Sequence, residues 1–249
     1  MRVGLFIPCY VDQFYPKVGL ATVEVLRKLG VTVDYPRDQT CCGQPMFNTG
    51  CVDEAKPLAR HFVDVFAEHE YVVCPSGSCV AMVRHHYGGL LGEEGLGGIR
   101  VFELCEFLWD VLAVDKVDGR FPHRVGLHQS CHGLRGLQLG TASELVGARE
   151  DKVAGLLQSI EGLEMADLNR PDECCGFGGT FAVEEEAISC AMGLDRLEDH
   201  SQAEVEVMTS VDMSCLMHLS GLAKRRGDVV RFLHIAEVLA ESLPERAAP

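Results

Sequence analysis

Short apolar runs alternate with stretches of helical periodicity along the chain. In the first half, four runs have the length of a strand: Val3–Pro8, Val31–Tyr35, Tyr71–Cys74 and Val101–Phe102. Continuous apolar runs of this length are typical of strands that are covered on both faces. Between them, residues 18–29 and 53–68 carry apolar side chains at helical spacing, which predicts two helices.

The second half repeats this alternation, with strands predicted at Val125–His128, Leu163–Leu168, Val205–Thr209 and Val229–Leu233. Sequence landmarks recur in the same order: Arg2-Val3-Gly4-Leu5 with Arg124-Val125-Gly126-Leu127, Cys41-Cys42-Gly43 with Cys174-Cys175-Gly176, and Ser78-Cys79 with Ser214-Cys215. A shared order of landmarks indicates a duplication. We therefore predict an α/β protein of two repeats, residues 1–118 and 119–249, with mostly parallel sheets related by a pseudo-two-fold axis.

Composition and charge narrow the classes of function. The 249 residues are 47% hydrophobic and carry a net charge of −15. Such an acidic chain is repelled by nucleic acids and by anionic membrane surfaces, so we expect neither as a partner. The amino-terminal stretch has one basic residue and no small-residue cleavage site, and no apolar run approaches the roughly 18 residues of a membrane span. These features predict a cytoplasmic protein without direct membrane insertion.

Twelve cysteines in a cytoplasmic chain point to metal ligation or thiol chemistry rather than to structural disulfides. Eight of them recur between the halves and follow the ends of predicted strands, where α/β proteins bind ligands. Four thiolates from three loops suit a soft metal centre in each repeat. The eight candidate ligands are Cys9, Cys41, Cys42, Cys79, Cys131, Cys174, Cys175 and Cys215.

The pattern favours an iron–sulfur cluster over zinc. Structural zinc usually takes cysteines two to four residues apart, whereas adjacent cysteines diverge and suit several metal atoms. The glycine after each pair is expected to let the backbone pass close to a bulky cluster. Zinc and a reducible dithiol at Cys41-Cys42 or Cys174-Cys175 remain as alternatives.

Other residues have simpler interpretations. The four cysteines that do not recur are expected to be buried small apolar residues, although one precedes Cys79 by only five positions; they are Cys51, Cys74, Cys105 and Cys190. The Glu184–Glu186 run predicts the solvated first turn of a helix. The glycines at 88–98 lack a phosphate-loop pattern, and no catalytic residue is assigned.

The histidines His85, His86, His128 and His132 are expected to be exposed on helices and loops. Two of them flank Cys131, and these could instead tune a cluster through hydrogen bonds to its sulfur atoms.

The cysteine segments together resemble the cysteine-rich CCG-domain family. The resemblance covers essentially the whole chain and rests on Cys41-Cys42-Gly43-Gln44-Pro45, Pro75-Ser76-Gly77-Ser78-Cys79, Cys174-Cys175-Gly176-Phe177-Gly178-Gly179, Asp212-Met213-Ser214-Cys215 and the closing segment 233–239. The family includes the B subunit of heterodisulfide reductase and the iron–sulfur subunit of glycolate oxidase. In the former, each repeat ends in Cys-x-x-Cys and five cysteines hold a non-cubane cluster. Here Met82 and His218 stand at the place of the fifth cysteine, so an ordinary four-thiolate cluster is expected instead.

The resemblance implies an oxidoreductase subunit with one or two [4Fe-4S] clusters on the eight cysteines, although zinc could fill one repeat. Short members with two repeats are implied to act with a ferredoxin-like iron–sulfur partner subunit and a third lactate-utilisation protein. Together these oxidise a small 2-hydroxy acid, L-lactate, to pyruvate. The alternatives are a zinc-stabilised scaffold and a subunit of the heterodisulfide reductase, thiol–disulfide reductase or glycolate oxidase type.

Overall fold

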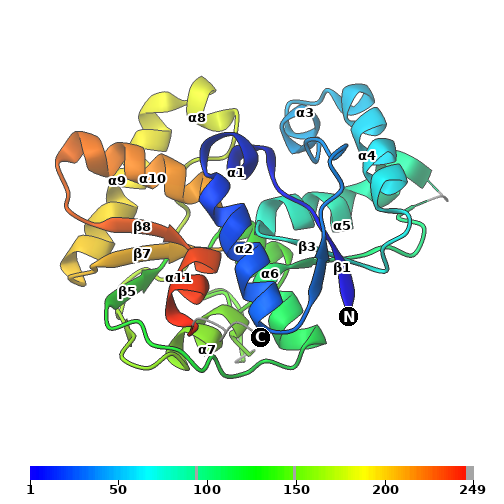
Figure 1. The fold of residues 1–249 in the computed structure, drawn as a ribbon. Coiled ribbons are helices and arrows are strands. Elements are labelled where there is room, and N and C mark those ends of the chain that lie inside the picture. Colours follow the sequence, from blue (N-terminus) through cyan, green and yellow to red (C-terminus); the bar gives the residue numbers. More distant parts are fainter. Residues whose placement is uncertain (93–94, 148–149, 245–249) are drawn as a thin grey trace.

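Two parallel sheets form the framework of the protein in the computed structural model, which describes residues 1–92, 95–147 and 150–244. Within this part of the chain each sheet has four strands (Figure 1). The first has the order β2-β1-β3-β4 and comprises β1 (Arg2–Leu5), β2 (Thr32–Asp34), β3 (Tyr71–Cys74) and β4 (Arg100–Glu103). The second has the order β6-β5-β7-β8 and comprises β5 (Arg124–Leu127), β6 (Glu164–Met165), β7 (Val207–Ser210) and β8 (Arg231–His234).

The two sheets match in pairing as well as in strand order. Where β1 ends, the backbone N–H of Phe6 donates to Val73 O at 2.9 Å, and where β5 ends, the N–H of His128 donates to Thr209 O at 2.8 Å. Each observed strand overlaps a predicted one, so the predicted duplicated α/β fold is confirmed.

Helices cover the sheets and carry the loops of the site. In the first repeat they are α1 (Cys9–Phe14), α2 (Pro16–Lys28), α3 (Gln44–Asn48), α4 (Val52–Phe66), α5 (Gly77–Leu91), α6 (Leu104–Glu106) and the π-helical turn η2 (Phe107–Val111). In the second they are the π-helical turn η3 (His132–Gly136), α7 (Lys152–Gln158), α8 (Phe181–Glu184), α9 (Glu186–Gln202), α10 (Met213–Arg226) and α11 (Ile235–Ser242).

The two predicted helices are α2 and α4, with ends shifted by one or two residues. Helix α2 begins at Pro16 because proline fits the first helical turn, where its missing N–H is no loss. The run 184–186 is exposed as predicted, and it spans the end of α8 and the start of α9 rather than one first turn.

The last helical segment of each repeat packs against a helix of the other repeat. Helix α11 lies beside α2 at the centre of the molecule (Figure 1), and Lys28 Nζ donates to the carbonyl oxygens of Ala240 and Leu243. In the matching contact α6 packs against α7, and the Trp109 ring covers Gly155 so closely that a Cβ there would lie 2.7 Å from it. One hydrophobic core therefore runs through both repeats.

Among the described residues, no helix combines the length and the apolar character that crossing a membrane requires.

Candidate metal centre

In the first repeat, three loops at the carboxyl ends of the strands carry the cysteines. Cys9 begins α1, Cys41 and Cys42 follow β2, and Cys79 lies in the first turn of α5. Gln39 fixes the loop before Cys41: its Nε2 donates to Leu5 O at 3.1 Å and its Oε1 accepts from the backbone N–H of Ile7 at 2.7 Å.

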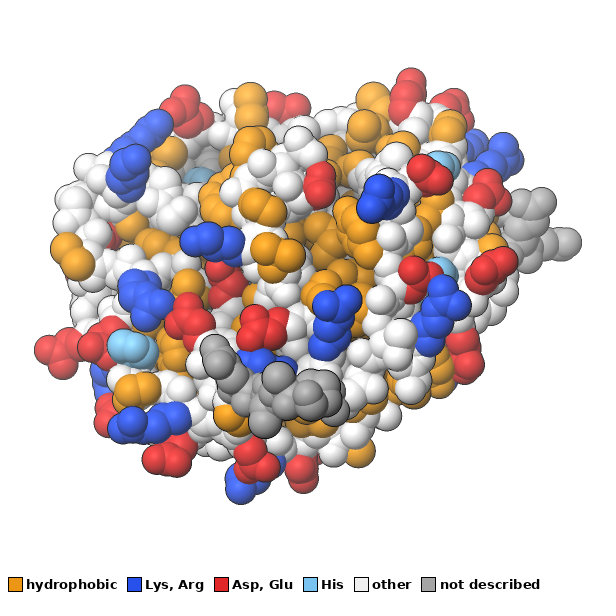
Figure 2. Space-filling view, viewed as in Figure 1, with side chains coloured by type: hydrophobic (Ala, Val, Ile, Leu, Met, Phe, Trp, Pro, Cys, Tyr) orange, Lys and Arg blue, Asp and Glu red, His pale blue; other side chains and the backbone are white. Residues whose placement is uncertain are grey.

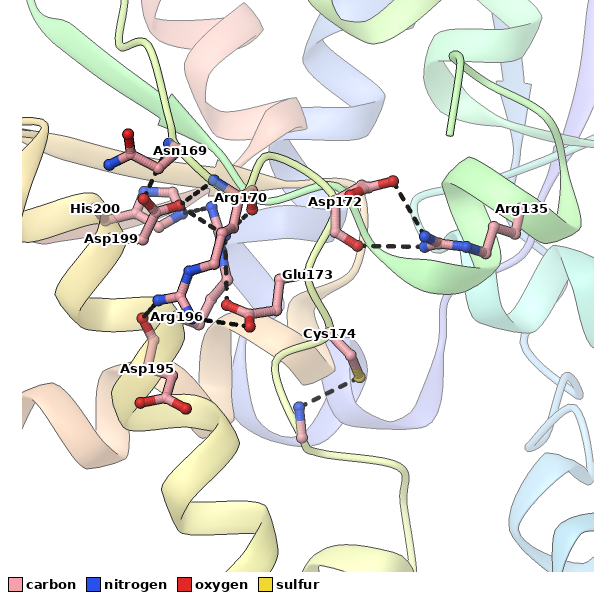
Figure 3. Close-up of polar contacts among 11 residues, drawn as sticks. Arg135, Asn169, Arg170, Asp172, Glu173, Cys174, Asp195, Arg196, Asp199 and His200 are labelled. Atoms are coloured by element: carbon pink, nitrogen blue, oxygen red, sulfur yellow. Dashed lines mark hydrogen bonds and ion pairs between the residues drawn. The ribbon is translucent and has the colours of Figure 1, made fainter. Parts of the chain in front are cut away.

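In the second repeat, the loop before Cys174 is held by a network of charged side chains (Figure 3). Asp199 accepts the backbone N–H groups of Asn169 and Arg170 at 3.0 and 3.1 Å. Arg196, which is fully buried, donates to Asp199 at 3.0 Å and to Arg170 O. In each half, side chains that the sequence did not point to hold the loop that carries the paired cysteines.

All eight recurring cysteines line one cavity between the repeats. It lies near α1, α3 and α8, at the upper end of the molecule in Figure 1, and hydrophobic side chains, with which cysteine is coloured, gather in this region in Figure 2. Across it, the Tyr10 ring of one repeat meets the Phe177 ring of the other edge-on at 5.9 Å. The structure thus brings together every residue that the spacing selected.

Within each repeat the sulfur atoms contact one another. The Sγ atoms of Cys42 and Cys79 are 3.5 Å apart. Hydrogen bonds from the thiols of Cys42 and Cys9 lower the pKa of Cys41 to about 3, and the N–H of Gly43 adds to this effect at 3.4 Å. A sulfur held as thiolate is the form that binds metals.

The second repeat repeats this arrangement. Hydrogen bonds from Cys131 and then Cys175 lower the pKa of Cys174 to about 2, and the Gly176 N–H lies 3.4 Å from its sulfur. Soft, partly ionised donors in groups of four fit a soft metal centre in each repeat.

The glycines after the cysteine pairs share a backbone conformation but differ in their surroundings. Gly43 and Gly176 both have left-handed backbone angles, φ 81° and 85°. A Cβ at Gly176 would lie 2.6 Å from the carbonyl oxygen of Ser189 on α9. A helix backbone is therefore a close neighbour that requires glycine at 176, and the passage of the backbone beside a cluster stays a prediction.

Asp212 lines the cavity and joins the two repeats, a role that the sequence analysis missed. Its Oδ1 accepts the hydroxyls of Ser76 and Ser78, both at 2.8 Å, and its Oδ2 accepts that of Ser130 at 2.6 Å. The only available signal was its place in the Asp-Met-Ser-Cys segment, since the serines lie 82 to 136 positions away.

The four remaining cysteines differ in burial. Cys74 and Cys105 are fully buried, as predicted. The prediction is wrong for Cys51, which is exposed because it caps α4 at the surface, and Cys190 is half-buried. Burial raises the pKa of Cys74, and its thiol also donates a hydrogen bond to Cys79, so it adjoins the first group of ligands.

The histidines also differ in exposure. His85, His86 and His132 are exposed, as predicted. His128 is only 1% exposed, so the prediction is wrong for this residue, because it directly follows the buried strand β5. Burial lowers the pKa of His128 to about 4, which keeps the ring neutral.

The two residues at the place of a fifth cysteine have other surroundings in the structure. Met82 is fully buried in the core. His218 Nε2 lies 3.3 Å from Ser189 O, against α9.

Comparison with known proteins assigns the chain to a family. Residues 3–84 and 125–220 match the CCG cysteine-rich domain, one match for each repeat. The chain therefore belongs to the CCG cysteine-rich domain family. Lactate utilization protein A 2 of Bacillus cereus (strain Q1) is 37% identical over 250 residues, 98% of this chain and 99% of that protein. Lactate utilization protein A of Halalkalibacterium halodurans is 39% identical over 96% of both chains.

Among solved structures, the glutamate racemase of Francisella tularensis covers 96% of this chain and 78% of its own, with a TM-score of 0.36 and 12% identity. A likeness of this size carries no argument about function.

Proposed function

We propose that this protein is an iron–sulfur electron-transfer subunit of an assembly that oxidises L-lactate to pyruvate. The observation that supports this most directly is the pair of four-thiol groups, one from each repeat, at a single cavity. The names of the full-length relatives support lactate as the substrate of the assembly.

The eight recurring cysteines are the proposed ligands. When bound, an iron–sulfur cluster supplies one-electron transfer, and the protein sets its potential through hydrogen bonds and exposure. Cys42, Cys79 and Cys175 are buried, whereas the other five proposed ligands are partly exposed. Such graded exposure suits electron exchange with a partner at the cavity mouth.

Oxidation of lactate to pyruvate releases two electrons and two protons. We propose that a ferredoxin-like iron–sulfur subunit exchanges these electrons with this chain, and that a third lactate-utilisation protein completes the assembly. In this scheme the chain is an oxidoreductase subunit that acts with its partners.

The test is a measurement of iron, acid-labile sulfide and zinc on protein purified without oxygen, with visible and electron paramagnetic resonance spectra of the same sample. Iron and sulfide in equal, several-fold excess over protein, with a colour that bleaches on reduction, are expected. Protein without iron or sulfide after anaerobic reconstitution would overturn the proposal.

One observation favours a second candidate, a zinc-stabilised scaffold. Thiolates around one tetrahedral ion, at about 2.3 Å from the metal, lie about 3.8 Å apart. The 3.5 Å separation of Cys42 and Cys79 is close to this value. Stoichiometric zinc without sulfide would support the scaffold.

A further inference from the structure

The two repeats differ at one buried position beside the metal ligands. Phe6 and His128 make the same backbone hydrogen bond to the neighbouring strand, so they are structurally equivalent. Both side chains are buried, at 0% and 1% exposure. The first repeat thus places a phenyl ring where the second places an imidazole.

The side chains around this position also differ between the repeats, apolar in the first and polar in the second. In the first repeat the Phe6 ring packs against Phe62 and Phe66 of α4, with ring centres 5.1 and 5.9 Å apart. In the second repeat, Arg196 and His200 occupy the corresponding turns of α9, also four residues apart, and both are buried. A closed apolar cluster in one repeat is therefore a polar cluster in the other.

Glycines on the strands confirm the correspondence between the helices. A Cβ on Gly4 of β1 would lie 2.9 Å from the Phe66 ring, and one on Gly126 of β5 would lie 2.3 Å from Nδ1 of His200. The two strands contact the same place on α4 and α9, so Phe66 and His200 are equivalent.

The ring nitrogens of His128 make no hydrogen bond with this polar cluster. Arg196 directs one guanidinium nitrogen to Nε2 of His200 at 2.9 Å. Neither ring nitrogen of His128 has a hydrogen-bond partner within the described residues. An unpartnered buried polar group destabilises a fold, and a ligand bound to the ring would offset that cost.

The His128 ring meets the thiols of the second repeat. One of its nitrogen atoms and the Sγ atoms of Cys175 and Cys215 all lie within 4.8 Å of one another. Atoms at such distances can bind one metal atom, and imidazole and thiolate together suit iron or zinc. No imidazole stands at the equivalent position of the first repeat, where Phe6 lies.

We propose that His128 is a metal ligand of the second repeat, so that the two repeats hold their centres with different donors, thiolates alone in the first and thiolates with an imidazole in the second. The inference rests on the proposed function only in requiring a metal centre there. An imidazole is neutral where a thiolate is negative, so if His128 replaced one thiolate, the second centre would have the higher reduction potential of the two.

The test is pulsed electron paramagnetic resonance of the reduced protein, purified anaerobically from cells grown with ¹⁵N-histidine. A nitrogen coupling of the size of a directly bound imidazole is expected in the unsubstituted protein. It should disappear in His128→Phe, which copies the first repeat, and persist in His132→Phe, which removes the exposed neighbour of Cys131.

A second variant tests the inference if His128→Phe does not fold. His128→Asn keeps a polar side chain beside Arg196 and His200 and is also expected to lose the coupling. An iron–sulfur signal without a nitrogen coupling, a coupling only of the small size of a hydrogen-bonded nitrogen, or one that persists in His128→Asn would overturn the inference while leaving the iron–sulfur function intact.

Zinc in place of iron would instead overturn the proposed function. X-ray absorption at the zinc edge would then decide the role of His128. Nitrogen in the zinc ligand shell that is lost in His128→Asn would support it, and an all-sulfur shell would overturn it.

Discussion

Cys42 is the most buried of the four proposed ligands in the first repeat and contacts Cys79 directly, while both repeats contribute to the same cavity. We expect Cys42→Ser to remove iron from the first repeat only, about half of the total, because a hydroxyl is a poor ligand for a soft metal. Iron analysis and the paramagnetic signals of the two centres measure this effect.

Cys51→Ser is the matched control, since Cys51 is exposed and does not line the cavity. It should leave the iron content unchanged. Equal loss of both signals in Cys42→Ser would show that the two groups of thiols hold one shared centre.

Glu103 gives the stability of the protein a dependence on pH. Burial raises its pKa from 4.5 to about 8, and the nearby charges of Glu106 and Asp212 add to this effect. The folded state therefore binds a proton that the unfolded chain has lost, and the free energy of unfolding falls as pH rises from 4.5 to 8.

We expect Glu103→Gln to flatten this part of the pH profile, since an amide oxygen still accepts the N–H groups of Cys105 and Glu106 that cap α6. Urea unfolding between these pH values measures the slope. The exposed Glu68→Gln is the control and should keep it. An unchanged slope in Glu103→Gln would contradict the assignment.

At the level of single elements, the placement of the paired cysteines depends on the turn formed by the glycine that follows them. Gly176 is pressed against Ser189 O, whereas a Cβ on Gly43 would meet only side-chain carbon atoms at 3.5 Å or more. Both have a left-handed φ. We expect Gly43→Ala to lower the free energy of unfolding by about 1 kcal/mol, because alanine disfavours a left-handed φ. Gly176→Ala should lower it by more, because its added Cβ also pushes the loop away from α9.

Thermal unfolding of both variants at equal metal content checks this difference. Gly176→Ala should also lose metal from the second repeat, because the shifted loop carries Cys174 and Cys175. Equal stability of the two variants would contradict the close approach to α9.

Strands and helices could be predicted because apolar runs and helical periodicity are local signals, and the eight cysteines because they recur. The burial of His128 was missed although the repeated segments place it opposite Phe6. The sequence does not show which helix residues pack on these two positions. Asp212 and the Arg196–Asp199 pair were missed for the same reason: their partners lie on other loops. Contacts between distant segments leave no periodic pattern.

At the scale of the whole molecule, the contacts of α11 with α2 and of α6 with α7 make each repeat depend on the other. The inner face of α2 buries Val18, Val25 and Leu26, and α11 buries Val238 and Leu239. Because α11 belongs to the second repeat, a separated first repeat would expose the apolar surface of α2 that α11 covers. In the same way, a separated second repeat would lose the Trp109 ring from α7.

We therefore expect fragments 1–118 and 119–249, made separately, to show no cooperative urea unfolding by circular dichroism, and their mixture to regain it. The lost burial of several large apolar side chains, at about 1.5–3 kcal/mol each, exceeds the stability of a typical small domain. The intact chain carrying Lys28→Met is the control: it loses the hydrogen bonds to Ala240 and Leu243 but keeps the apolar contact, so it should unfold cooperatively. A cooperative transition in either isolated fragment would show that the repeats are independent domains, and would place the cavity between two separately stable units.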